Sequence, residues 1–162
     1  MNAKANNSKN SSLVITVLAS KLYKLVMDNP FIDLKKYIDD CTKLLDNEGF
    51  GSQYGANNEN YTTNVYESGE MIWSIKLDPD HDERGYGVVL DFINQEIKRG
   101  EKGYFTENPI KVGDNGTILG KVSSDIDPNS PPESYTINFQ VLKNGLKSTP
   151  VLTIDPRLKI NQ

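Results

Sequence analysis

The chain has 162 residues, of which 36% are hydrophobic and 25% are charged, so it is long enough to form one domain with a hydrophobic core. Its formal net charge of −4 and the lack of any basic stripe argue against partners such as nucleic acid or an anionic membrane surface. The single cysteine, Cys41, excludes an internal disulfide.

The N-terminal region divides into a polar leader and a first strand. Residues 1–11 are polar and lack aromatic side chains, which predicts a disordered tail ahead of one domain at 12–162. From Ser12 to Ala19 the side chains are apolar on both faces and often β-branched, a pattern typical of a strand inside a sheet. The apolar run Leu13–Ala19 is too short to cross a bilayer.

A change of period after this strand predicts an amphipathic helix at Ile32–Leu45. Apolar residues recur there every three or four positions, with charged residues between them. Asp33 is the expected N-terminal cap, and Asn47–Gly49 is the expected end. A shorter helix or turn is expected at Lys21–Met27. The apolar stripe of the longer helix either covers the domain or binds a partner.

The middle of the chain, Tyr61–Ile93, carries the clearest strand–turn–strand pattern. It follows a glycine-rich loop, residues 49–60, that has no phosphate-binding fingerprint. Residues 61–65 alternate as a strand, and Gly69 is expected to supply a positive φ in the turn after it. Two further strands flank an acidic loop at 78–87. Their expected core-facing residues are Met71, Trp73, Ile75 and Leu77 in one strand, and Val88, Leu90 and Phe92 in the other.

The C-terminal half reads as short strands separated by turns. Tyr104, Phe105 and Ile110 are expected to anchor the charged segment 95–111 to the core. A Gly-Asp-Asn-Gly turn at 113–116 and a proline-rich loop at 123–133 enclose a strand at 117–122. The remaining strands are expected at 135–141, 151–154 and 157–160, with a hairpin turn at Lys143–Gly145.

These short strands with regularly spaced turns predict an all-β fold. The expected architecture is an antiparallel β-sandwich of the Greek-key or jelly-roll kind, with one inserted amphipathic helix near Ile32–Leu45.

The acidic segment Asp78–Glu83 is the densest group of candidate ligands. Asp78, Asp80 and Asp82 are spaced like the start of an EF-hand calcium loop, but Glu83 stands where that loop needs glycine and Val89 where it needs a carboxylate. A calcium site completed by another loop stays open as an alternative.

Catalytic patterns are missing from the sequence. His81 is the only histidine, and nothing in the sequence brings it to Cys41, which we expect to be buried. We therefore assign no catalytic, cofactor-binding or metal-binding residue, expect no cofactor, and predict that the protein is not an enzyme.

The order of the strands resembles that of the AidA/PixA family of bacterial inclusion-body proteins. The similar segments are residues 13–18, 65–73, 87–93, 118–122, 135–141 and 151–156. The resemblance implies a β-sandwich without known catalytic residues, in an abundant intracellular protein that can pack into inclusions. No functional residue can be carried over, because the similar positions are those that determine the fold.

The leading hypothesis is a non-enzymatic, cytoplasmic bacterial β-sandwich protein with a structural role, which associates with itself or with a protein partner. The alternative is a recognition module for carbohydrate or calcium, which would use loop tyrosines and the acids of Asp78–Glu83.

Overall fold

The computed structural model describes residues 9–29 and 33–161. The predicted tail therefore lies mostly outside the described residues, and Ser11 is already the first residue of a strand. The elements, in chain order, are β1 (Ser11–Val17), α1 (Ala19–Asp28), α2 (Leu34–Cys41), β2 (Thr42–Asp46), β3 (Gly51–Ser52), η1 (Asn58–Asn60), β4 (Thr62–Tyr66), β5 (Glu70–Leu77), β6 (Tyr86–Gln95), β7 (Ile110–Lys111), β8 (Ile118–Lys121), β9 (Glu133–Lys143), β10 (Leu146–Lys147), β11 (Leu152–Ile154) and β12 (Arg157–Asn161).

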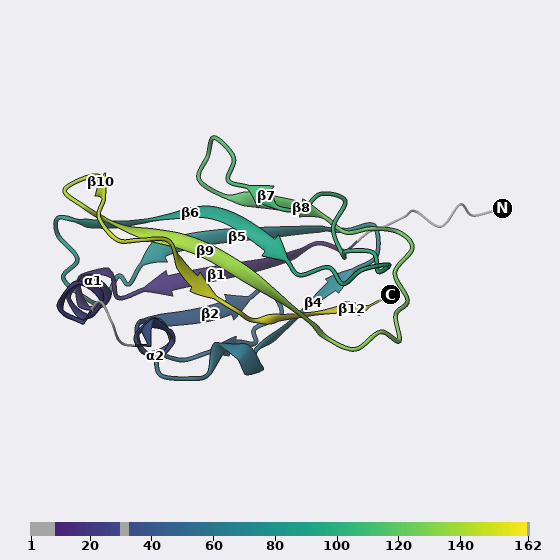
Figure 1. Ribbon diagram of the computed structural model, residues 1–162, viewed down its shortest axis with the longest axis horizontal. Helices are drawn as coiled ribbons and strands as arrows, with labels where there is room; N and C mark the ends of the chain where they lie inside the picture. The colour runs from purple at the N-terminus through teal and green to yellow at the C-terminus, as the bar shows by residue number, and fades with distance from the viewer. Residues whose placement is uncertain (1–8, 30–32, 162) are drawn as a thin grey trace.

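The strands form two mixed sheets, so the prediction of a mostly β chain is confirmed (Figure 1). Sheet A has the order β3-β2-β1-β5-β8, and sheet B has the order β4-β12-β9-β6-β7, with β10 and β11 also paired to β9. The expectation of purely antiparallel sheets is wrong, because β1 pairs with β5 and β4 pairs with β12 in parallel. Long connections separate the strands of each parallel pair, which allows the chain to return in the same direction.

The hydrophobic core lies between the two sheets. Trp73 of β5 in sheet A and Tyr135 of β9 in sheet B are both fully buried, and the Trp73 indole N–H donates a hydrogen bond to the Tyr135 hydroxyl at 3.1 Å. The ring of Phe105 meets Trp73 edge to face at a centroid distance of 5.3 Å. The predicted core position of Trp73 is therefore confirmed, and its one polar atom is satisfied from the opposite sheet.

The strand β9 follows the predicted alternation closely. Its core-facing residues are all buried, and they are Tyr135, Ile137, Phe139 and Val141. The hairpin turn after it is also confirmed, since Asn144 and Gly145 both have positive φ, at 51° and 78°. This combination is the type I′ turn that matches the twist of a two-stranded hairpin.

The strand β6 departs from the predicted alternation at its centre. Its pairing with β9 shifts between Leu90 and Phe92, which marks a β-bulge at Asp91. The extra residue reverses the alternation, so that Leu90 and then Ile93 are buried, while Phe92 is only partly buried. The predicted inward position of Phe92 is therefore wrong.

The predicted helix at Ile32–Leu45 is a shorter helix followed by a strand. Asp33 caps α2 as expected, because its carboxylate accepts a hydrogen bond from the Lys35 amide at 3.0 Å. The helix ends at Cys41, however, and β2 begins at Thr42 and pairs with β1 in antiparallel register. Leu44 and Leu45 consequently point to opposite faces of sheet A rather than along one helical stripe. Ile32 lies outside the described residues.

The segment predicted as a short helix or turn forms the longer helix α1, and α1 and α2 lie together at one end of the strands (Figure 1). Ala19, Leu22 and Val26 are the buried apolar residues on the inner side of α1. This helix packs against α2, β6 and β9, and α2 packs against β11 and β2. No helix among the described residues is long and apolar enough to span a membrane.

The turn between β4 and β5 uses Gly69 for a different reason from the one predicted. The residue with positive φ is Ser68, at 60°. At Gly69, a Cβ atom would lie 2.2 Å from the carbonyl oxygen of Lys9. Glycine is needed at this position because another backbone segment approaches it closely.

Candidate functional site

The acidic loop predicted at 78–87 places its first carboxylate inside the protein rather than on its surface. Asp78 is only 3% exposed, and its backbone N–H donates to the Val17 carbonyl at 3.1 Å. The Tyr54 hydroxyl donates a hydrogen bond to one oxygen of the Asp78 carboxylate. The backbone N–H of Asp80 donates to the other oxygen at 2.8 Å. Both oxygens of the carboxylate are therefore held by donors of the same chain.

The surroundings of Asp78 keep it ionised. The hydrogen bond from Tyr54, the amide of Asp80 and the nearby His81 lower the pKa of the Asp78 carboxyl from 3.8 to about 2. The Lys43 ammonium lies 3.9 Å from the same carboxylate and 5.1 Å from the centroid of the Tyr54 ring. Burial, followed by the hydrogen bond to Asp78, raises the pKa of the Tyr54 hydroxyl. The group is thus a buried ion cluster with its hydrogen bonds satisfied.

Two other acids of the loop, Asp82 and Glu83, have separate partners. The Asp82 carboxylate pairs with the Arg84 guanidinium at 2.8 Å on the surface. The Glu83 carboxylate is buried and accepts a hydrogen bond from the Ser20 amide at 2.7 Å, in the first turn of α1. Within residues 9–29 and 33–161, no three acids, histidines or cysteines come together in a way that could hold a metal ion. The carboxylates of Asp78, Asp82 and Glu83 are thus engaged by partners within the chain, and the calcium alternative stays a prediction.

The lone cysteine is buried, as predicted. Cys41 has no exposed surface, and burial raises the pKa of its thiol to about 11. A thiol in this environment stays protonated and unreactive near neutral pH. The side chain of His81 is 56% exposed and lies beside Asp78. The arrangement does not form a cysteine–histidine pair.

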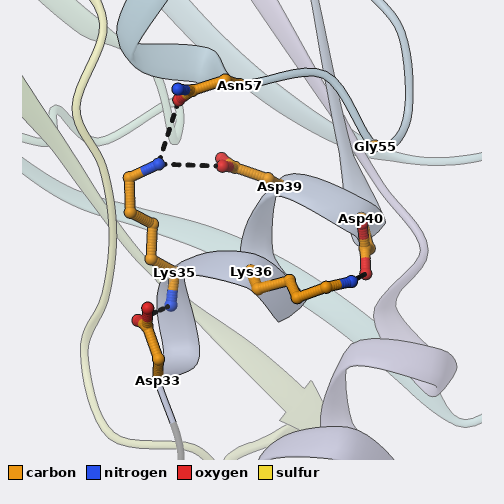
Figure 2. Close-up of a pocket in the computed structure, with 7 residues that line it drawn as sticks. All are labelled: Asp33, Lys35, Lys36, Asp39, Asp40, Gly55 and Asn57. Atoms are coloured by element: carbon orange, nitrogen blue, oxygen red, sulfur yellow. Dashed lines mark hydrogen bonds and ion pairs between the residues drawn. The ribbon is translucent and has the colours of Figure 1, made fainter.

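A polar pocket of about 310 Å³ opens between α2 and the loop after β3 (Figure 2). The charged side chains that line it pair with one another. The Lys35 ammonium lies 3.1 Å from the Asp39 carboxylate and 3.0 Å from the Asn57 amide oxygen. The Lys36 ammonium lies 3.1 Å from the Asp40 carboxylate. A ligand that entered the pocket would therefore meet charges that are already neutralised within the chain.

Beneath this pocket, one buried amide joins α2, β2, β3 and η1. Asn58 has no exposed surface, and its NH₂ group donates to the Asp39 carboxylate at 2.9 Å and to the Thr42 hydroxyl at 3.0 Å. The Ser52 hydroxyl donates to the Asn58 carbonyl oxygen at 3.0 Å. A buried network with every member satisfied fixes the position of these elements. Its role is structural.

Apolar side chains are exposed to solvent on the outer face of sheet A, which is the face turned away from the core. Leu45 on β2 is 55% exposed, Ile72 on β5 is 37% exposed and Leu119 on β8 is 43% exposed. The half-buried Val14 on β1 stands directly beside Leu45, and Ile72 stands directly opposite Leu119. In the β1–β5 register, Val14 is level with Ser74 and Ile72 is level with Ser12. The two apolar pairs are therefore offset by two residues along the strands and form a stepped row across four adjacent strands. We call this set the apolar row.

Sequence patterns missed both of the groups just described, the Asp78 cluster and the apolar row. The sequence shows the acids at 78–83, but Tyr54 and Lys43, which contact Asp78, are far from them in the chain. The helical spacing around Leu45 predicts a single apolar stripe and gives no indication that Leu45 pairs with Val14. The alternation at Met71 and Trp73 did contain the signal for Ile72, which must point outward when its two neighbours point inward.

Comparison with known proteins finds similarity in structure only. The sequence matches no family model and no curated protein. The fold is similar to the crystal structure of an inclusion body protein, PixA, from Burkholderia cenocepacia J2315, with a TM-score of 0.61 and 9% sequence identity. The similarity covers 99% of this chain and 100% of that chain. It agrees with the resemblance in strand order noted in the sequence, and we conclude that this chain shares its fold with a PixA inclusion body protein.

Proposed function

We propose that the protein is a non-enzymatic structural protein that associates with copies of itself. The observation that carries the proposal is the apolar row on the outer face of sheet A, defined by Val14, Leu45, Ile72 and Leu119. Single exposed apolar residues are common on protein surfaces, but several of them gathered on one face of a sheet are a candidate contact surface. Burial of this row against another chain would remove its apolar surface from water.

Two further observations support this proposal. The structural neighbour from Burkholderia cenocepacia is described as an inclusion body protein, and the similarity of fold extends over the whole of both chains. In addition, the polar clusters of this chain are occupied by their own hydrogen bonds and ion pairs. Asp78 is held by Tyr54, and Lys35 is held by Asp39 and Asn57. These groups stabilise the fold, whereas the apolar row gathers exposed apolar side chains on one face of a sheet.

Sedimentation velocity tests the proposal. It is measured on the wild-type chain and two variants at protein concentrations from about 1 µM to about 1 mM. In the test variant, Leu45, Ile72 and Leu119 are replaced by threonine, which keeps the preference for strands. In the control variant, Leu146 and Val151, which are 71% and 44% exposed elsewhere on the surface, are replaced by threonine.

We expect the wild type and the control variant to associate as concentration rises. The test variant should associate at least about tenfold more weakly, because each 1.4 kcal/mol of lost association energy is a factor of ten. A wild-type chain that stays monomeric over the whole range would refute the proposal. A test variant that associates like the wild type would show that the apolar row is not the contact.

A further inference from the structure

The strand β5 presents opposite charges at equal distances from its centre on the outer face of sheet A. Its residues Met71 and Trp73 are buried in the core, so the even-numbered residues face outward. In order along the strand, the outward-facing residues are Glu70, Ile72, Ser74 and Lys76. An acid and a base therefore stand three residues to either side of Trp73, with an apolar residue and a small polar residue between them.

Neither of these two charges is neutralised within the described part of the chain. Among residues 9–29 and 33–161, neither Glu70 nor Lys76 lies within ion-pair distance of an opposite charge. Lys121 stands opposite Glu70 on β8 without forming a salt bridge to it. By contrast, Lys43 lies on the same face and its ammonium is 3.9 Å from the Asp78 carboxylate. Glu70 and Lys76 are thus available to a partner.

We propose that two copies of this chain pack with the outer faces of their A sheets together, about a two-fold axis that runs between the two sheets, across the direction of β5 and level with Trp73. This inference rests on the proposed self-association and specifies its geometry. In a two-fold contact, residues at equal distances on either side of the axis meet across the interface. Glu70 of each copy then pairs with Lys76 of the second copy, and Ile72 lies over Ser74 of the second copy.

The pattern identifies a second copy as the occupant, because it is complementary to itself. With the two β5 strands antiparallel across the interface, both Glu70–Lys76 pairs form at once. Face-to-face sheets lie about 10 Å apart, a distance that long charged side chains at the rim can bridge while shorter apolar side chains fill the centre. The apolar row is buried in the same step. A partner of different sequence would need no such symmetry along β5.

A charge-reversal experiment tests this geometry. Glu70→Lys gives a chain with lysine at both positions, and Lys76→Glu gives a chain with glutamate at both. Each variant alone would place like charges opposite each other, so each should associate at least about tenfold more weakly than the wild type. An equimolar mixture should restore association as mixed pairs, since every contact in the mixture joins a lysine to a glutamate.

The same full-length chains provide the controls. Lys147→Glu changes an exposed charge on β10, away from sheet A, and should associate like the wild type alone and in any mixture. The double variant Glu70→Lys/Lys76→Glu carries both reversed charges on one chain. Two copies of it can again form both pairs across the interface, so it should associate again. Thermal unfolding of each variant confirms the fold, because changes at such surface positions typically alter stability by no more than about 0.5 kcal/mol.

Sedimentation velocity and native mass spectrometry of the separately mass-labelled variants give the readout. Weakened single variants with restoration in the mixture would support the inference. Wild-type association with unaffected single variants, or with no restoration in the mixture, would overturn this geometry and leave self-association standing. A wild-type chain that is monomeric at every concentration would overturn both.

Discussion

The buried carboxylate of Asp78 yields a sharp prediction, because its environment defines both a magnitude and a pH dependence. We consider the substitution Asp78→Asn, which keeps the size of the side chain and removes the charge. The pKa of this carboxyl falls from 3.8 to about 2 on folding, chiefly through the hydrogen bond from Tyr54 and the Asp80 amide. Because one pKa unit corresponds to about 1.4 kcal/mol, the ionised form stabilises the folded state by about 2 kcal/mol.

The sign of the pH dependence follows from the lowered pKa. Since the folded state binds the proton of Asp78 more weakly than the unfolded state, the stabilisation is complete above the unfolded pKa and is lost as the pH falls through the folded pKa. The contribution is therefore about 2 kcal/mol at pH 7 and about half of that at pH 3. Asp78→Asn should lower the unfolding free energy by about 2 kcal/mol at pH 7, with a fall in Tm of about 4–8 °C.

Urea unfolding at pH 7 and at pH 3 measures this effect in the wild type and the variant. The matched control is Asp82→Asn, since the Asp82 side chain is 63% exposed and its pair with Arg84 lies on the surface. The control should change the unfolding free energy by no more than about 0.5 kcal/mol. An Asp78→Asn variant as stable as the wild type, or a deficit of equal size at both pH values, would refute the reasoning.

Two further predictions concern the core and the β4–β5 turn. Tyr135→Phe leaves the buried indole N–H of Trp73 without its acceptor, so urea unfolding should show a free energy of unfolding lower by about 1–3 kcal/mol. The control is Tyr86→Phe, which should lower it much less because the Tyr86 hydroxyl makes no hydrogen bond within the described residues. Gly69→Ala should destabilise the protein because its Cβ would lie 2.2 Å from a backbone oxygen, and Gly113→Ala, whose nearest neighbour is at 3.5 Å, should unfold at nearly the wild-type temperature. Equal effects within either pair would contradict these explanations.

The parts of the fold that could be predicted are those that local chemistry decides. In β9 the alternation from Tyr135 to Val141 matches one buried face of a sheet, and Asn144 and Gly145 are the residues that a type I′ turn requires. These signals need no information from the rest of the chain. The buried Trp73 was predictable for the same reason, because its alternation with Met71 is local.

The parts that could not be predicted depend on distant segments. The spacing of Cys41, Leu44 and Leu45 fits a helix as well as a strand boundary, and the pairing of β2 with β1 decides the matter. The bulge at Asp91 reverses the faces of β6 without a sequence signal that identifies it. The two parallel pairings likewise depend on how the chain returns after long connections.

The candidate sites show the same division. The sequence pattern indicates an acidic cluster from Asp78 to Glu83. In the structure Asp78 is an internal partner of Tyr54 and Glu83 of the first turn of α1, whereas Asp82 pairs with Arg84 on the surface. The apolar row could not be predicted, since it joins residues from four strands whose order in sheet A is set only by folding.

The most direct test of the central claim is the molar mass of the wild-type chain in solution, measured by light scattering from about 1 µM to about 1 mM. Association through the outer face of sheet A predicts a molar mass that rises with concentration beyond that of one chain and falls again on dilution. A molar mass that equals that of one chain at every concentration would contradict the account.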